Sequence, residues 1–187
     1  MSRPSSKKQQ IEAALVEVVI RKGLSGTSIQ DIAQEAGVSP ALLYRYWRDR
    51  DELAGAVYRR HFHELMERLT ARAEAAQGAL AKLEAMADEF LRLAEESPRS
   101  IQFILLSQHD LYAGIPREEG LRVLIRGVID SGVDRGEIRK MDVDLAVQLY
   151  IGIVIQPVIG RLYGAGRTAW SAQRDGIVGA VRRLLSA

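Results

Sequence analysis

Apolar residues recur at helical spacing along almost the whole of this 187-residue chain. Ile11, Ala14 and Leu15 begin the pattern, and Val18 and Val19 follow one turn later on the same helix face. Gly, Ser and Pro residues interrupt the pattern at short intervals, and no pair of alternating segments joined by a tight turn predicts a β-hairpin. The spacing therefore predicts an all-α protein of about nine helices.

One segment leaves a choice between helix and strand. Residues 145–163 are apolar nearly all round, and the β-branched Ile151, Ile153 and Val154 in its middle would suit a buried strand. Helix is favoured because the apolar pattern exceeds about 15 residues and no partner strand is available. A helix that is apolar all round is buried or lies in an interface.

Composition and spacing exclude several classes of protein. The chain has no cysteine, so disulfide bonds and thiolate sites are excluded. Its first residues are too polar for a secretory signal, and the longest apolar run, 149–160, is shorter than the ~18 residues of a membrane span. We therefore expect a cytoplasmic protein without a membrane partner.

No catalytic or metal-binding arrangement stands out. His61 and His63 lie two residues apart on an expected helix, so they point to different faces and make a poor metal pair. Gly164–Ala169 fits the nucleotide-binding pattern G-x-G-x-x-A, but the 18 residues after it are too few for a βαβ unit. We predict no enzyme activity, no metal site and no cofactor.

Two short helices around a tight turn carry the main functional prediction. Thr27 or Ser28 caps the first helix, and Gly37 ends it. Ser39–Pro40 starts the second, with the Ser39 hydroxyl as its cap, and this second helix runs to about Trp47. Such a turn places the second helix across the first in a helix-turn-helix. The N-terminal residues of the second helix would then meet base edges in the major groove of DNA.

Positive charge gathers in the same part of the chain. Arg45, Arg48 and Arg50 lie close together at and beyond the second helix, where they form a phosphate-contacting footprint. Arg3, Lys7 and Lys8 belong to a basic tail that is either an arm reaching DNA or a solvated terminus. The distribution of charge is thus typical of a DNA-binding N-terminal region.

The same stretch resembles a known family. The run Gly26–Ser39, followed by Leu43–Trp47 and Arg50–Leu53, resembles the TetR family of transcriptional regulators. This resemblance implies a three-helix helix-turn-helix DNA-binding domain in residues 1–50. It also implies a C-terminal helical bundle for ligand binding and dimerisation in residues 51–187.

The resemblance implies DNA contacts residue by residue. The predicted DNA-binding residues are Thr27, Ser28, Gln30, Ser39, Pro40, Ala41, Leu42, Tyr44, Arg45, Tyr46 and Arg50. Arg45 can fork to guanine, and Gln30 can pair with adenine. Trp47 stands where the family commonly has Phe, and Arg50 stands where Lys is common; an Arg can fork to a phosphate where Lys acts as a point charge.

A ligand pocket and a dimer interface are expected in the C-terminal helices. The polar candidates for the pocket are Gln102, Gln108, His109, Tyr112, Tyr150 and Gln156. The alternative interpretation is that these are core or interface residues. The candidates for the homodimer interface, on two apolar helices, are Gly152, Ile155, Ile159, Ile177, Val181 and Leu184.

The function predicted from these features is a ligand-responsive transcriptional regulator. It would act as a repressor that a small molecule, of a kind the sequence does not specify, releases from a pseudo-palindromic double-stranded operator. The alternative hypothesis is a helical small-molecule-binding protein or helical-bundle enzyme without DNA binding.

Overall fold

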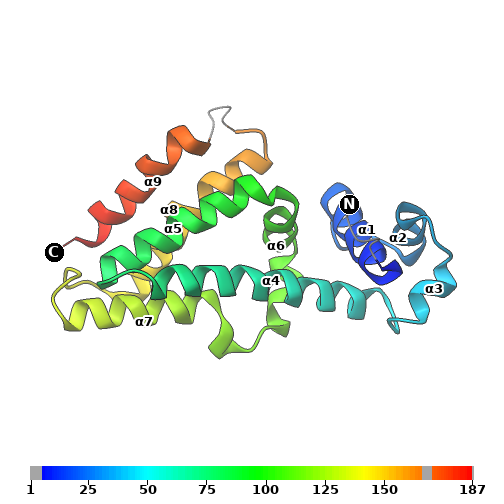
Figure 1. Cartoon of the computed structure of the whole chain (residues 1–187), viewed down its shortest axis with the longest axis horizontal. Coiled ribbons are helices and arrows are strands. Elements are labelled where there is room, and N and C mark those ends of the chain that lie inside the picture. The colour runs from blue at the N-terminus through cyan, green and yellow to red at the C-terminus, as the bar shows by residue number, and fades with distance from the viewer. Residues whose placement is uncertain (1–5, 166–169, 187) are drawn as a thin grey trace. The chain divides into compact units, whose positions relative to one another are not determined.

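The computed structural model describes residues 6–165 and 170–186. Within them the chain forms nine α-helices and two short 3-10 helices (Figure 1). The helices are α1 Lys7–Lys22, α2 Ile29–Ala36, α3 Pro40–Tyr44, α4 Arg50–Glu74, α5 Ala79–Glu96, α6 Pro98–Leu111, η1 Tyr112–Gly114, η2 Arg117–Glu119, α7 Leu121–Asp134, α8 Val143–Leu162 and α9 Trp170–Leu185. The all-α prediction is confirmed, including helix for the ambiguous β-branched segment.

The described residues divide into two compact units. Unit 1 comprises Met1–His63 and Arg99–Ile115, and unit 2 comprises Glu64–Pro98 and Pro116–Ala187. Helix α4 contributes residues to both units. The expected boundary between a DNA-binding domain and a ligand-binding and dimerisation domain, after residue 50, stays a prediction.

The helix ends of the N-terminal part follow from local chemistry. The Ser28 hydroxyl accepts a hydrogen bond from the Asp31 amide at 3.1 Å and caps α2, while Gly37 ends it in the left-handed conformation (φ 62°). Ser39 precedes α3 as expected, but its hydroxyl makes no capping bond. The predicted hydroxyl cap is wrong because the Leu42 amide bonds instead to the Ser39 backbone carbonyl at 3.0 Å.

The core of unit 1 joins α1, α2 and the first half of α4. Ile11, Ile32, Leu43 and Leu53 are among its buried side chains. Trp47 is also buried, at 6% exposed, so the chain turns inward after α3, which ends at Tyr44 and not near Trp47 as predicted. Aromatic and aliphatic burial of this kind supplies the main stabilisation of so small a unit.

In the same unit, α4 and α6 meet through an aromatic cluster. Tyr58 stacks on Phe62 with ring centroids 6.1 Å apart, and Phe103 of α6 approaches the edge of Tyr58 at 6.3 Å. His61 Nδ1 lies 2.8 Å from the Ser100 hydroxyl. These contacts fix α6 beside α4.

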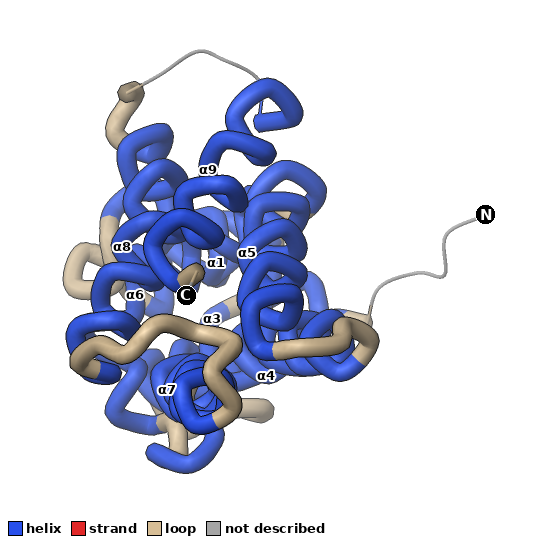
Figure 2. The backbone as a smooth tube through the Cα atoms, turned by 90° about the vertical axis from the view of Figure 1, so that its left-hand side faces the viewer, coloured by secondary structure: helices blue, strands red, loops and turns tan. Residues whose placement is uncertain are grey.

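Unit 2 is a bundle in which α5 packs against α7, α8 and α9 (Figure 2). Gly132 of α7 allows close approach, since a Cβ there would lie 2.5 Å from Ala79 Cβ and 2.6 Å from Ile138 Cδ1. At the seam of α4 and α5, Glu89 is 1% exposed and pairs with the guanidinium of Arg68. A buried carboxylate needs such a partner to offset its desolvation.

Helix α8 is the most apolar element of unit 2. Asp142 caps it, with its carboxylate accepting from the Leu145 amide at 2.8 Å. By length and composition alone, α8 is able to cross a membrane, although its longest uninterrupted apolar run is too short to indicate this. Core helices of soluble proteins can have the same length and composition. Leu145 and Leu149 on this helix are 49% and 40% exposed, so part of its apolar surface is left uncovered within the chain.

Candidate DNA interface and apolar cavity

The short helix α3 presents an exposed face. Pro40, Ala41 and Arg45 are exposed, and Tyr44 and Tyr46 are 56% and 45% exposed. Large exposed aromatic rings of this kind are available to a partner. Among the residues that the structure describes, Arg45 forms no ion pair or side-chain hydrogen bond, so its five N–H donors remain available.

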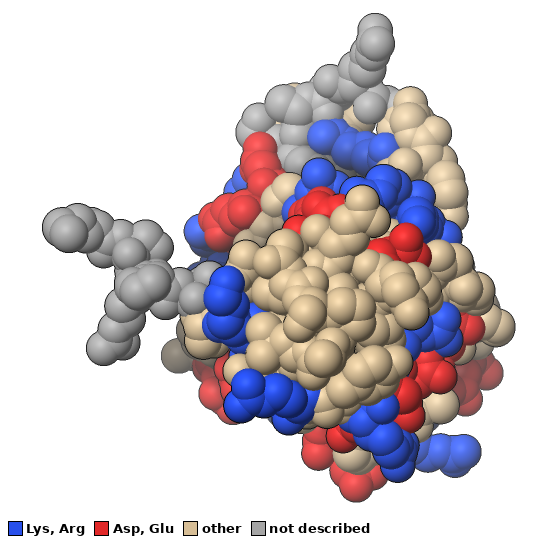
Figure 3. All heavy atoms as spheres, turned by 90° about the vertical axis from the view of Figure 1, so that its right-hand side faces the viewer, with Lys and Arg blue, Asp and Glu red and all other residues tan. Residues whose placement is uncertain are grey.

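Charge surrounds this face and leaves its middle neutral. Figure 3, which views the chain from the side of α2 and α3, shows an uncharged area bordered by Lys and Arg side chains, with Asp and Glu among them. Arg48, which follows α3 in the chain, has a side chain 84% exposed and an ion pair to Asp49 at 3.0 Å. An uncharged centre with Lys and Arg side chains at its border suits a helix that enters a groove between two phosphate backbones.

The other predicted DNA-binding residues, on and around α2 and α3, lie in different environments. Gln30 is exposed in the first turn. The Ser28 hydroxyl is engaged with Asp31, and Thr27 is 3% exposed with its hydroxyl donating to the Gly23 carbonyl at 2.7 Å. Leu42 is half-buried and Ser39 is exposed. DNA contacts from all of these residues stay predictions.

Ion pairs hold α2 against α1. Lys22 Nζ lies 2.6 Å from Asp31, and Arg21 lies 2.8 Å from Glu35. The hydrogen bond from Lys22, followed by those from Ser28, lowers the pKa of Asp31 to about 2. The Asp31 carboxylate therefore stays ionised at all but strongly acidic pH.

The N-terminal turn of α1 contacts the helix-turn-helix directly. Gln10 Nε2 donates to the Ala36 carbonyl at 2.9 Å, and Lys8 Nζ lies 5.7 Å from the centre of the Trp47 ring. Lys7 and Lys8 are exposed, while Arg3 lies outside the described residues. Whether the tail reaches DNA stays a prediction.

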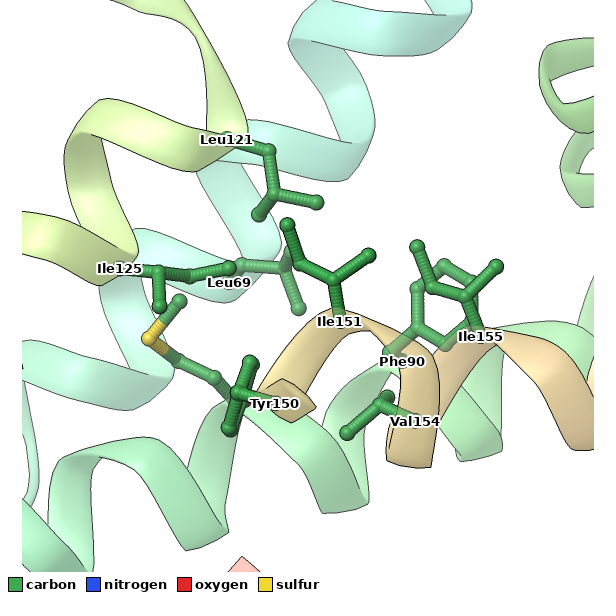
Figure 4. Close-up of a pocket in the computed structure, with 9 residues that line it drawn as sticks. Leu69, Phe90, Leu121, Ile125, Tyr150, Ile151, Val154 and Ile155 are labelled. Carbon is green, nitrogen blue, oxygen red and sulfur yellow. The ribbon is translucent and has the colours of Figure 1, made fainter. Parts of the chain in front are cut away.

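A narrow apolar cavity lies within unit 2 (Figure 4). It is lined by Leu69, Met86, Phe90, Leu121, Ile125, Tyr150, Ile151, Val154 and Ile155, which come from α4, α5, α7 and α8. The space open to the centre of a water molecule is about 10 Å³. A ligand larger than one water would therefore have to part the side chains that line it.

Of the six polar pocket candidates, Tyr150 lines this cavity. Its hydroxyl is turned away into the bundle and donates to the Leu83 carbonyl at 2.8 Å, and burial raises the pKa of the phenol. Gln102 and Tyr112 are half-buried in unit 1, and Gln108, His109 and Gln156 are exposed. Ligand contacts from these residues stay predictions.

The dimer candidates also differ in their surroundings. Gly152 is exposed, and Ile159, Ile177 and Leu184 are partly exposed. Ile155 lines the cavity, and Val181 is fully buried within the chain itself. Their places in a dimer interface stay predictions.

The cavity residues were not singled out from the sequence, apart from Tyr150 and Ile155. Leu69, Phe90 and Ile125 fit the apolar stripe of their helices, and an apolar stripe is typical of any core position. No signal in the sequence separates a residue that packs against a neighbour from one that faces a void. Among the described residues, no group of three His, Cys, Asp or Glu side chains could hold a metal ion.

Comparison with known proteins identifies the class. Residues 11–57 match the family described as bacterial regulatory proteins, tetR family. A "Fatty acid metabolism regulator protein" of Bacillus subtilis (strain 168) is 26% identical over 164 residues, which cover 84% of each chain. The N-terminal region of this chain therefore carries the DNA-binding domain of the TetR family of transcriptional regulators.

Two solved structures share the fold over almost the full length. FadR from Bacillus subtilis, in complex with stearoyl-CoA, superposes with a TM-score of 0.75 at 19% identity, covering 92% of this chain and 96% of FadR. AibR, in complex with isovaleryl coenzyme A and operator DNA, superposes with a TM-score of 0.74 at 18% identity, covering 94% of this chain and 98% of AibR. The similarity confirms the nine-helix architecture of the described residues.

Proposed function

We propose that this regulator is a cytoplasmic homodimeric repressor, which binds a pseudo-palindromic operator through α2 and α3 and is released by an acyl-CoA. The exposed face of α3, with Arg45 unengaged beside Tyr44 and Tyr46, is the observation that carries the DNA-binding part. Two copies related by a two-fold axis would present two such faces to the two halves of a palindrome.

The DNA-binding part is tested by selection. The purified protein is incubated with a pool of random-sequence duplexes, and the bound sequences are read. We expect an inverted repeat, and binding to it that weakens steeply with salt because phosphate contacts release counterions. Recovery of sequences without any inverted repeat would contradict the operator proposal.

The effector proposal is supported by the apolar cavity of unit 2. Its nine side chains offer an acyl chain an apolar lining, and the relatives that bind stearoyl-CoA and isovaleryl coenzyme A share the fold. The cavity is narrow, so a ligand would favour a conformation with the helices further apart. A ligand shifts such an equilibrium only by its difference in affinity for the two states.

The effector is tested by thermal unfolding with stearoyl-CoA, isovaleryl-CoA and free CoA. We expect an acyl-CoA to raise the unfolding midpoint by mass action and to release the selected duplex, and free CoA to do neither. Ile151→Phe fills the cavity and should reduce the shift. Val123→Phe is the matched control, since Val123 is 48% exposed on α7 and does not line the cavity.

The dimer is supported by the uncovered apolar surface of α8. Leu145 and Leu149 lie one turn apart and would lose water contact against a second copy. Sedimentation velocity should show a dimer for the wild type and a monomer for the double variant Leu145→Glu with Leu149→Glu. Val123→Glu, at an exposed apolar residue of α7, should stay dimeric.

A further inference from the structure

The guanidinium of Arg50, the first residue of α4, is tied to the turn that precedes α2. Its Nη1 donates to the carbonyl oxygens of Thr27 at 3.0 Å and Leu24 at 3.3 Å. Its Nε donates to the Asp51 carboxylate at 2.8 Å, and Nη2 pairs with the same carboxylate at 2.6 Å. All three side-chain nitrogens of Arg50 therefore face oxygen atoms of its own unit.

The turn that Arg50 holds leads directly into α2. The Thr27 amide donates to the Leu24 carbonyl across the turn at 3.1 Å. The next residue, Ser28, is the N-cap of α2, and the exposed Gln30 lies in its first turn. Arg50 thereby determines where α2, with its predicted DNA contacts, leaves the turn.

The same contacts leave little of Arg50 for a phosphate. A guanidinium has five N–H donors; three of them donate to the two carbonyl oxygens and to Asp51, and Nη2 lies 2.6 Å from the same carboxylate. The Asp51 side chain is 74% exposed, so a phosphate that approaches Arg50 meets a negative charge. A lysine could not make this set of contacts, because its ammonium is a point charge without a fork.

We propose that Arg50 is a positioning residue for operator binding and not a phosphate ligand. Its fork holds the turn between α1 and α2, and through that turn it sets the start of α2 against the DNA. The inference rests on the proposed DNA-binding function. DNA affinity then depends on the shape of the side chain at residue 50 and not on its charge.

The test separates the fork from the charge. Arg50→Lys keeps the charge and loses the fork, whereas Arg50→Gln loses both. Arg48→Gln is the matched control, because Arg48 is a neighbouring exposed arginine whose side chain pairs with Asp49 and whose backbone amide donates to Glu52. Kd for the duplex selected by the wild-type protein is measured by fluorescence anisotropy over a series of KCl concentrations, and amide hydrogen exchange is measured on the free proteins.

Both Arg50 variants should bind the duplex about tenfold more weakly than the wild type, with an unchanged slope of log Kd against log[KCl]. The amides of Thr27 and Asp31 should exchange faster in both variants, while that of Val18, in the buried face of α1, should not change. Arg48→Gln should leave the exchange of the Thr27 amide as in the wild type.

A phosphate contact would produce a different pattern, with Arg50→Lys binding like the wild type and Arg50→Gln lowering the salt slope by about 1. That pattern would overturn the proposal. Unchanged exchange of the Thr27 amide, or faster exchange that includes Val18, would overturn it too. If the wild type selects no duplex, the proposed function fails and this role with it, while exchange in the free protein still reports whether Arg50 holds the turn.

Discussion

Substitution of Tyr150 by Phe can separate an effect on stability from an effect on ligand binding. In Tyr150→Phe the ring still lines the cavity, and the change removes a buried hydroxyl that donates to the Leu83 carbonyl at 2.8 Å. A neutral hydrogen bond of this kind contributes about 1 kcal/mol net. For a chain of this length that loss lowers the unfolding midpoint by about 2 to 4 °C.

The assay is thermal unfolding of both proteins at one protomer concentration, because dimerisation makes the midpoint depend on concentration. The hydroxyl points away from the cavity, so the variant should keep the wild-type shift of the midpoint with stearoyl-CoA. Loss of that shift with no change in the midpoint of the free protein would refute the reasoning and would make Tyr150 a polar ligand contact. Burial raises the pKa of this phenol, so we expect the same result throughout the neutral range.

Three further predictions concern stability, DNA affinity and acid sensitivity. Gly132→Ala should lower the free energy of unfolding, measured with urea, by about 1 to 3 kcal/mol through overpacking. Gly127→Ala on the same helix, with nothing within 4 Å of the new Cβ, should raise it by up to about 1 kcal/mol. Equal effects of the two substitutions would contradict the packing. Arg45→Gln should weaken binding to the selected duplex about tenfold to a hundredfold at an unchanged unfolding midpoint. The pKa of Asp31 is lowered to about 2, mainly by the hydrogen bond from Lys22, so the stabilisation by its carboxylate is present above the unfolded pKa and is lost as pH falls from about 4 towards 2. The free energy of unfolding, measured with urea, should therefore fall less steeply over this pH range in Asp31→Asn than in the wild type. An identical pH dependence would disprove the coupling.

The recognition helix shows how far local sequence can be followed. Pro40 suits the first position of a helix, where its missing N–H has no partner to lose, and Gly37 accepts the left-handed conformation at low cost, so both helix ends were predictable. The end of α3 was placed too late, because Trp47 turns into a core made by residues distant in sequence. Helical periodicity contains no information about such a neighbour.

The environments of the site residues were less predictable. Thr27 and Arg50 match positions that the family resemblance assigns to DNA contacts, but their side chains bond to backbone carbonyls of unit 1. Polarity was a poor guide to the cavity for a related reason: Gln108 and Gln156 are exposed, while apolar side chains line the space. A side chain's partners depend on which elements meet around it.

The sequence by itself determined the all-α class, the positions of Gly37, Ser39 and Pro40 at helix ends, and the family. These follow from periodicity and from residue-specific backbone preferences, which act over a few neighbouring residues. Only the tertiary structure decided that Arg50 reaches back to the carbonyls of the preceding turn and that an apolar cavity lies beside Tyr150. Those features depend on distances between segments far apart in the chain, and such distances are set by packing of the whole core.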